Sequence, residues 1–185
     1  MKAIRIAVVP LLLFLVFVVA QLLAAPLEID FKNGLADYTH WIKVNERLSP
    51  MDPVVAMMCS APAPRAENDP HAKYYVSVFV NETGLKAMRK KIPGPFPVGS
   101  MIVKQKLRDK KAPPELLTMM IKREPGFDPG FGNWEYLIAS GDGKAILGRG
   151  KMDLCKGCHV SMAEQDYVYR TYSGMPLATP LPQAH

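Results

Sequence analysis

The pentapeptide Cys155-Lys156-Gly157-Cys158-His159 lies near the end of this 185-residue chain and decides how the segments before it are interpreted. Two thiols separated by two residues can each add to a vinyl group of a porphyrin, and the adjacent histidine can then bind the iron as its proximal ligand. The CxxCH spacing therefore predicts one haem c per chain, with Cys155 and Cys158 as thioether anchors and His159 as the iron ligand.

Two other kinds of site use a pair of cysteines at this spacing. A structural zinc site needs a second pair of ligands, and the third cysteine, Cys59, has no CxxC or HxxxH partner. A thioredoxin-like redox pair needs no histidine after its second cysteine. Haem attachment accounts for Cys155, Cys158 and His159 together, so it is favoured over both alternatives.

The first 25 residues have the composition of an export signal. A short positive region with Lys2 and Arg5 precedes an apolar run. Pro26 directly follows the small residues that a signal peptidase needs, and residues 6–25 are also long enough to span a bilayer. Residues 1–25 are therefore predicted to be either a cleaved signal peptide or a retained inner-membrane anchor. Because bacteria attach haem c outside the cytoplasm, both alternatives predict a periplasmic protein.

Residues 26–174 have the length of one domain with one core, and a proline-rich tail follows at 175–185. Segments rich in β-branched and aromatic residues indicate strands. The predicted strands cover residues 73–81, 100–107, 116–122, 134–139 and 144–151, the last two joined by the hairpin turn Ser140-Gly141-Asp142-Gly143.

Helices are predicted on both sides of these strands. The spacing of Leu35, Tyr38, Trp41 and Ile42 predicts a first helix over residues 35–48. Shorter helices are expected at residues 82–90 and at the CxxCH motif. The sequence therefore predicts an α+β fold, mainly an antiparallel sheet of about five strands with an N-terminal helix and a C-terminal haem-attachment helix.

The formal net charge of +6 comes from basic residues spread along the chain. A solvated surface explains this distribution, and docking to an acidic periplasmic redox partner is an alternative. No nucleic-acid-binding motif accompanies the charge, so nucleic acid is not expected as a partner.

The order of the segments resembles the cytochrome P460 family, which includes the β-type cytochromes c′. The resemblance covers residues 35–172 and implies a β-sheet dimer with one haem per chain, packed between the sheet and the CxxCH helix. The matching features are the helix with Trp41, YVSVFVN at 75–81, FPVGSMIVK at 96–104, GNWEY at 132–136, and CKGCH followed by Asp166-Tyr167-Val168.

The resemblance assigns a role to Lys104. In the P460 enzymes, which oxidise hydroxylamine, a lysine at the end of a G-[ST]-x-x-V-K segment bonds covalently to the porphyrin edge, and Lys104 matches it in residues 99–104. Strand alternation alone places Lys104 on one face with Ile102 and Lys106. That face has the pattern of a solvated surface, so a solvated Lys104 is the alternative.

On the distal side of the haem, this chain differs from the oxidising members. Those enzymes carry a carboxylate in the third strand and an arginine in the first, and the matching positions here are Thr118 and Val76. A hydroxyl is a poor general base at neutral pH. If the protein is an enzyme, it would be a hydroxylamine or nitric oxide oxidoreductase of P460 type, but the distal carboxylate is missing.

The predicted distal pocket is mostly apolar. A dry pocket suits neutral diatomics, above all nitric oxide, which the β-type cytochromes c′ mainly bind. The pocket residues are Val76, Val78, Thr118 and Met119. Met120 is a candidate distal ligand, which would make a His/Met electron-transfer haem, although ordinary core packing also explains it. The predicted function is an exported c-type cytochrome that binds or processes small nitrogen oxides, with electron transfer as the alternative.

Overall fold

The computed structural model describes residues 31–45, 49–50, 74–90 and 92–170. The predictions for residues 1–25, for Cys59 and for the tail at 175–185 lie outside this part of the chain. Within the described ranges, no helix has both the length and the apolar character needed to cross a membrane. The elements in chain order are α2 (Phe31–Asp37), η1 (Tyr38–His40), β1 (Ile42–Lys43), β2 (Ser49–Pro50), β3 (Tyr75–Val80), α4 (Glu82–Met88), β4 (Met101–Leu107), β5 (Pro114–Lys122), η2 (Pro129–Phe131), β6 (Trp134–Ser140), β7 (Ile146–Gly150), α5 (Asp153–His159) and η3 (Val160–Gln165).

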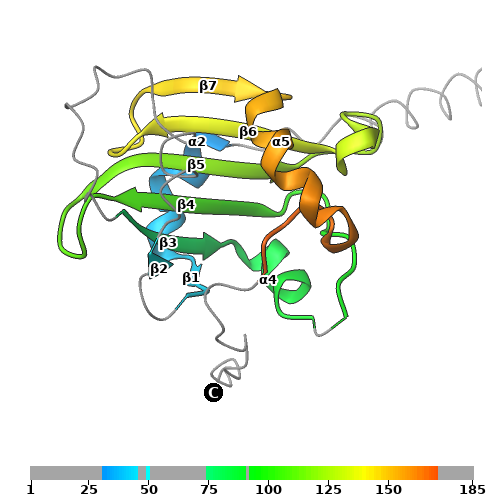
Figure 1. Cartoon of the computed structure of the whole chain (residues 1–185), viewed down its shortest axis with the longest axis horizontal. Helices are drawn as coiled ribbons and strands as arrows, with labels where there is room; N and C mark the ends of the chain where they lie inside the picture. Colours follow the sequence, from blue (N-terminus) through cyan, green and yellow to red (C-terminus); the bar gives the residue numbers. More distant parts are fainter. Residues whose placement is uncertain (1–30, 46–48, 51–73, 91, 171–185) are drawn as a thin grey trace, which may run out of the picture.

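One antiparallel sheet contains all the strands of the described residues (Figure 1). Its order is β1-β3-β4-β5-β6-β7, and β2 pairs with the same strand as β1, at the other end of β3. The strands β3 to β7 correspond to the five predicted ones. The two additional strands have two residues each, too short to show an alternating pattern. The predicted α+β fold with a mainly antiparallel sheet is confirmed.

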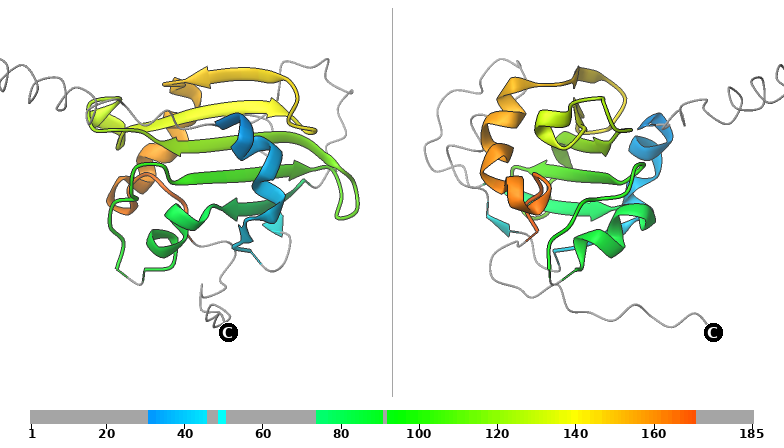
Figure 2. Two further views of the ribbon diagram at one scale, coloured as in Figure 1. Left: turned by 180° about the vertical axis from the view of Figure 1, so that it is seen from behind. Right: turned by 90° about the vertical axis from the view of Figure 1, so that its right-hand side faces the viewer.

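The sheet has a helical layer on each face (Figure 2). The helix α5 and the turn η3 cover one face, and α2 covers the other. A first core cluster lies on the α5 face and a second on the α2 face. The first cluster comprises Val78, Val80, Ala87, Met88, Phe96, Ile102, Met120, Trp134, Tyr136 and Val168, with Cys155 packed against it, and the second comprises Leu35, Tyr38, Val103, Leu117, Met119, Ile121, Leu137 and Ala139.

The prediction of a helix over residues 35–48 is wrong in its extent. The helix α2 begins at Phe31 and ends at Asp37, and the chain becomes extended at Trp41. The residues that follow include Ile42 and Val44, whose branched side chains lose rotamer freedom in a helix. They join the sheet instead, because the N–H of Val44 donates to the backbone oxygen of Val78 at 2.9 Å.

The helix α4 confirms the prediction of a short helix after β3. Asn81 caps it, because its Oδ1 accepts from the N–H of Gly84 at 3.0 Å. The same side chain accepts from the N–H of Met101 at 2.9 Å and donates to the backbone oxygen of Gly99 at 2.9 Å. Asn81 therefore ties the end of β3 and the start of α4 to the start of β4.

Candidate haem site

The CxxCH motif forms the helix α5, which lies over the sheet face of the first core cluster (Figure 1). Residues three apart on a helix point to the same side, so Cys155 and Cys158 can both reach one porphyrin edge. Neither cysteine forms a disulfide within the described residues, and both are half-buried. Asp153 in the first turn and Lys156 in the last suit the polarity of the helix dipole.

The imidazole of His159 is held in one orientation. Its Nδ1 lies 2.7 Å from the backbone oxygen of Tyr167, and a carbonyl can only accept, so Nδ1 carries the proton and Nε2 keeps a lone pair for a metal. The ring lies between those of Tyr136 and Tyr169, with centroids 5.5 and 5.3 Å away. A carbonyl partner of this kind is the usual support for a metal-binding histidine.

The charge state of His159 also suits an iron ligand. Burial lowers the pKa of His159, the hydrogen bond to Tyr167 partly opposes this shift, and the positive charge of Lys104 lowers the pKa further. The neutral imidazole is therefore favoured, and this is the form that binds metals.

Four residues on neighbouring strands form a row across this face, which we call the central row. In the strand register, Val78 pairs with Lys104, Lys104 with Thr118, and Thr118 with Ile138. Three of the four, all except Val78, are partly exposed. The register places Lys104 on the face that α5 covers, where its side chain is half-buried, so this lysine is not on a freely solvated surface.

The next row on the same face is buried throughout. It consists of Val80, Ile102, Met120 and Tyr136, which are between 0% and 8% exposed. Val76 is also buried on this side and pairs with Lys106. The predicted grouping of Val76 and Val78 with Thr118 agrees with the register, whereas the roles of these residues toward a ligand remain predictions.

The inclusion of Met119 in the distal pocket is wrong. Its side chain belongs to the second core cluster on the α2 face, and its Cε lies 3.3 Å from the position that a Cβ on Gly34 would take. Successive residues of a strand point to opposite faces of the sheet. Since Met120 faces α5, Met119 cannot face it as well.

The hydroxyl of Tyr136 has no hydrogen-bond partner among the described residues, although it is buried. Burial raises the pKa of Tyr136, and the nearby Cys155 raises it further. A buried polar atom without a partner is unusual and points to an absent group or water. Because this hydroxyl adjoins the CxxCH helix, it is an observation in favour of a cofactor with polar edges, and the residues present fit a haem.

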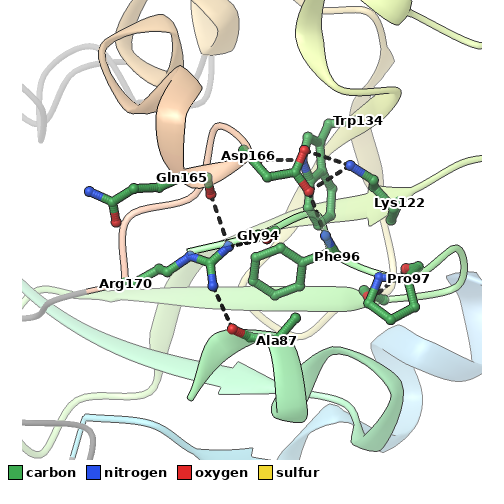
Figure 3. Close-up of polar contacts among 10 residues, drawn as sticks. Ala87, Gly94, Phe96, Pro97, Lys122, Trp134, Gln165, Asp166 and Arg170 are labelled. Atoms are coloured by element: carbon green, nitrogen blue, oxygen red, sulfur yellow. Dashed lines mark hydrogen bonds and ion pairs between the residues drawn. The ribbon is translucent and has the colours of Figure 1, made fainter. Parts of the chain in front are cut away.

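A polar network beside His159 was not predicted from the sequence (Figure 3). Asp166 and Lys122 form an ion pair with an N···O distance of 2.6 Å. The indole Nε1 of Trp134 donates to the backbone oxygen of Asp166 at 2.7 Å. The partners are far apart in sequence. The only earlier indication was that Asp166-Tyr167-Val168 is one of the segments that resemble the cytochrome P460 family.

The site lies within a stretch that a known family model matches. The model of cytochrome P460 matches residues 36–170. The chain belongs to the cytochrome P460 family. A comparison with curated proteins gives no match. Membership in the cytochrome P460 family implies a haem cofactor, which the helix α5 and the neutral imidazole of His159 are suited to hold.

Proposed function

We propose that this cytochrome P460 family member carries one haem c, attached through Cys155 and Cys158 with His159 as proximal ligand, and binds small nitrogen oxides, above all nitric oxide. One observation carries the proposal. On the sheet face that α5 covers, no strand residue of the described chain is an aspartate or glutamate, and Thr118 stands at the centre of that face.

The composition of this face decides between kinds of ligand chemistry. Oxidation of hydroxylamine requires the removal of protons, for which a positioned base contributes about 10²–10⁴-fold. The hydroxyl of Thr118 is a poor base at neutral pH. Nitric oxide carries no proton and needs no hydrogen-bond donor. The buried valines Val76 and Val78 therefore suit nitric oxide binding better than oxidation of hydroxylamine.

The residues of the chain have separable roles in this function. The bound haem supplies an iron with a coordination position for a diatomic ligand. His159 binds the metal through Nε2, and the backbone oxygen of Tyr167 keeps the proton on Nδ1. Val78, which is fully buried, excludes water from the sheet side.

The test is an absorption spectrum of the reduced holoprotein before and after addition of nitric oxide. We expect the Soret band to shift, and we expect no consumption of hydroxylamine above the rate of free haem. A Soret band that nitric oxide leaves unchanged would overturn the proposal. The variant Val103→Ala should show the same Soret shift as the parent protein, because Val103 is fully buried but packs on the α2 face.

Electron transfer is a second candidate function, and the position of Met120 favours it. Met120 faces α5 and pairs with Tyr136, whose ring contacts that of His159. A thioether bound to the iron would raise the reduction potential. A sulfur-to-iron charge-transfer band in the ferric protein would support this function, and a five-coordinate high-spin ferric spectrum would exclude it.

We further propose that the chain is exported to the periplasm, where it either loses residues 1–25 or keeps them as an anchor. Thioether formation outside the cytoplasm and the composition of residues 1–25 support this location. Cell fractionation with N-terminal sequencing of the haem-stained protein distinguishes a soluble form from a tethered one. The same preparation, run on a sizing column, tests the proposed homodimer.

A further inference from the structure

The loop that orients His159 is itself anchored by a buried ion pair. We propose that Lys122 and Asp166 act as a positioning latch: their ion pair holds the turn Asp166-Tyr167, and this turn sets the carbonyl of Tyr167 against Nδ1 of His159. The latch fixes the tautomer of the imidazole and raises its strength as an iron ligand. The second effect rests on the proposed function, because only an iron-bound imidazole has a ligand strength.

The turn has a backbone conformation that needs support. Asp166 and Tyr167 have φ values of 56° and 62°. These values lie in the left-handed region of backbone conformation, which is unfavourable for most residues other than glycine. The turn also packs tightly on Gly132, where an added Cβ would lie 2.8 Å from both Oδ1 of Asp166 and Cδ2 of Tyr167. Such a conformation persists only where the surrounding contacts hold it.

The contacts that hold the turn converge on Asp166 (Figure 3). Its two carboxylate oxygens accept from Nζ of Lys122 at 2.7 and 2.6 Å, and Oδ2 also accepts from the N–H of Phe96 at 2.7 Å. The ammonium of Lys122 lies 4.9 Å from the centre of the Trp134 ring. Since Lys122 ends β5 and Trp134 begins β6, Asp166 is tied to the end of the sheet.

Arg170 holds the flanks of the same segment. Its guanidinium donates to the backbone oxygens of Gly94 at 2.6 Å and Gln165 at 3.2 Å, and to that of Ala87. It also lies 4.6 Å from the centre of the Phe96 ring. Arg170 therefore fixes the segment as a whole, whereas the ion pair contacts the strained turn directly.

The effect of the latch passes to the iron ligand through one hydrogen bond. The carbonyl of Tyr167 belongs to the residue directly after Asp166, so releasing Asp166 displaces the acceptor that lies 2.7 Å from Nδ1. A hydrogen bond from Nδ1 increases the electron density on Nε2, and changes in such outer partners typically alter metal sites about 10–100-fold. A stronger imidazole ligand favours ferric over ferrous iron, so loss of the latch raises the reduction potential.

Three variants separate the latch from its surroundings. Asp166→Asn removes the charge, keeps the shape and tolerates a left-handed backbone. Lys122→Met keeps an apolar side chain over Trp134, and the double variant leaves neither charge buried alone. Glu135→Gln is the matched control, because the Glu135 side chain is 7% exposed and its ion pair with Arg149 is 2.7 Å long. That ion pair lies on the α2 face, away from His159.

Two measurements are made on each variant. The tautomer of His159 is read by long-range ¹H–¹⁵N NMR of the apoprotein at alkaline pH, where the ring is neutral, and the midpoint potential is read by spectroelectrochemistry of the holoprotein. We expect protonation at Nδ1 in the parent chain and in Glu135→Gln, with equal potentials. In the latch variants we expect a mixture of the two His159 tautomers. We also expect the preference of the site for ferric over ferrous iron to fall about tenfold, which corresponds to a rise of about 59 mV in the midpoint potential.

An unchanged tautomer and potential in a folded Asp166→Asn or double variant would overturn the latch. Equal shifts in Glu135→Gln would also overturn it, because they would show a general response to lost stability. The NMR measurement needs no haem. It therefore tests the latch even if the chain proves to hold no haem c, while the nitric oxide titration tests the proposed function separately.

Discussion

Lys104 and Thr118 are directly opposed on the neighbouring strands β4 and β5, at the centre of the sheet face that α5 covers. Side chains of directly opposed residues have Cβ atoms about 4.5–5.5 Å apart, so the side chains of Lys104 and Thr118 begin next to each other in the central row. Both residues are partly exposed, whereas the next row on this face is buried. A porphyrin held by α5 against this face would therefore lie near both side chains.

The first prediction concerns the bond between Lys104 and the porphyrin that the family resemblance implies. We expect proteolysis of the holoprotein to leave the Lys104 peptide joined to the haem peptide of residues 155–159, and Lys104→Met to abolish this species in the mass spectrum. Lys106→Met is the control, because Lys106 lies two residues further on the same face and is 4% exposed. A haem peptide without the Lys104 segment in the parent protein would contradict the prediction.

The second prediction concerns the sixth coordination position of the iron. If nitric oxide is the ligand, Met120 is a packing residue and does not bind the metal. We expect Met120→Leu to leave the ferric absorption spectrum unchanged and to cost less than about 1.5 kcal/mol of stability, as volume-conserving swaps do. Met119→Leu on the α2 face gives the matched comparison. Loss of a charge-transfer band in Met120→Leu alone would identify this methionine as a ligand.

The third prediction concerns the support of the His159 loop. Gly132→Ala places a Cβ 2.8 Å from atoms of Asp166 and Tyr167 on a residue with φ of 64°. We expect urea unfolding to show a loss of about 1–3 kcal/mol, the range for a strained backbone. Gly157→Ala, within α5, meets no atom within 4 Å and should stabilise the helix by about 0.5–1 kcal/mol. Equal effects of the two substitutions would refute the tight packing.

The strands β3 to β6 could be predicted because each carries β-branched or aromatic residues in a recognisable pattern, and β7 could be predicted because a hairpin turn precedes it. The partial burial of Lys104 could not be predicted in the same way. Both faces of this sheet are covered by helices, so alternation no longer separates a wet face from a dry one. A face that mixes Ile102 with Lys104 and Lys106 appears solvated in the sequence, although Lys106 is 4% exposed.

The CxxCH spacing predicts His159 as the iron ligand, whereas the contacts that support its ring could not be predicted from the sequence. Lys122 and Asp166 are 44 residues apart, and nothing in either local sequence marks a buried ion pair. Met120 shares its parity with Thr118 on β5 and Met119 does not, so the sequence already places Met119 on the opposite side of the strand, where the second core cluster contains it. Alternation along one strand was sufficient to separate the two methionines.

The last prediction concerns the missing distal base. Thr118 occupies the position at which the oxidising members of the family carry a carboxylate, and it lies beside Lys104. A carboxylate placed there could accept protons from bound hydroxylamine. We expect Thr118→Glu to raise the rate of hydroxylamine oxidation by about 10²-fold or more, the contribution of a positioned general base. The measurement is steady-state reduction of an artificial electron acceptor.

Thr118→Gln is the control for this gain, because glutamine has the size of glutamate and no basic carboxylate. We expect it to show the low rate of the parent protein while still binding nitric oxide. The rate of Thr118→Glu should rise with pH through the pKa of the new carboxyl, since only the ionised form accepts a proton. Equal rates for the two variants, with nitric oxide binding intact in both, would show that the side chain at position 118 does not face the reacting ligand.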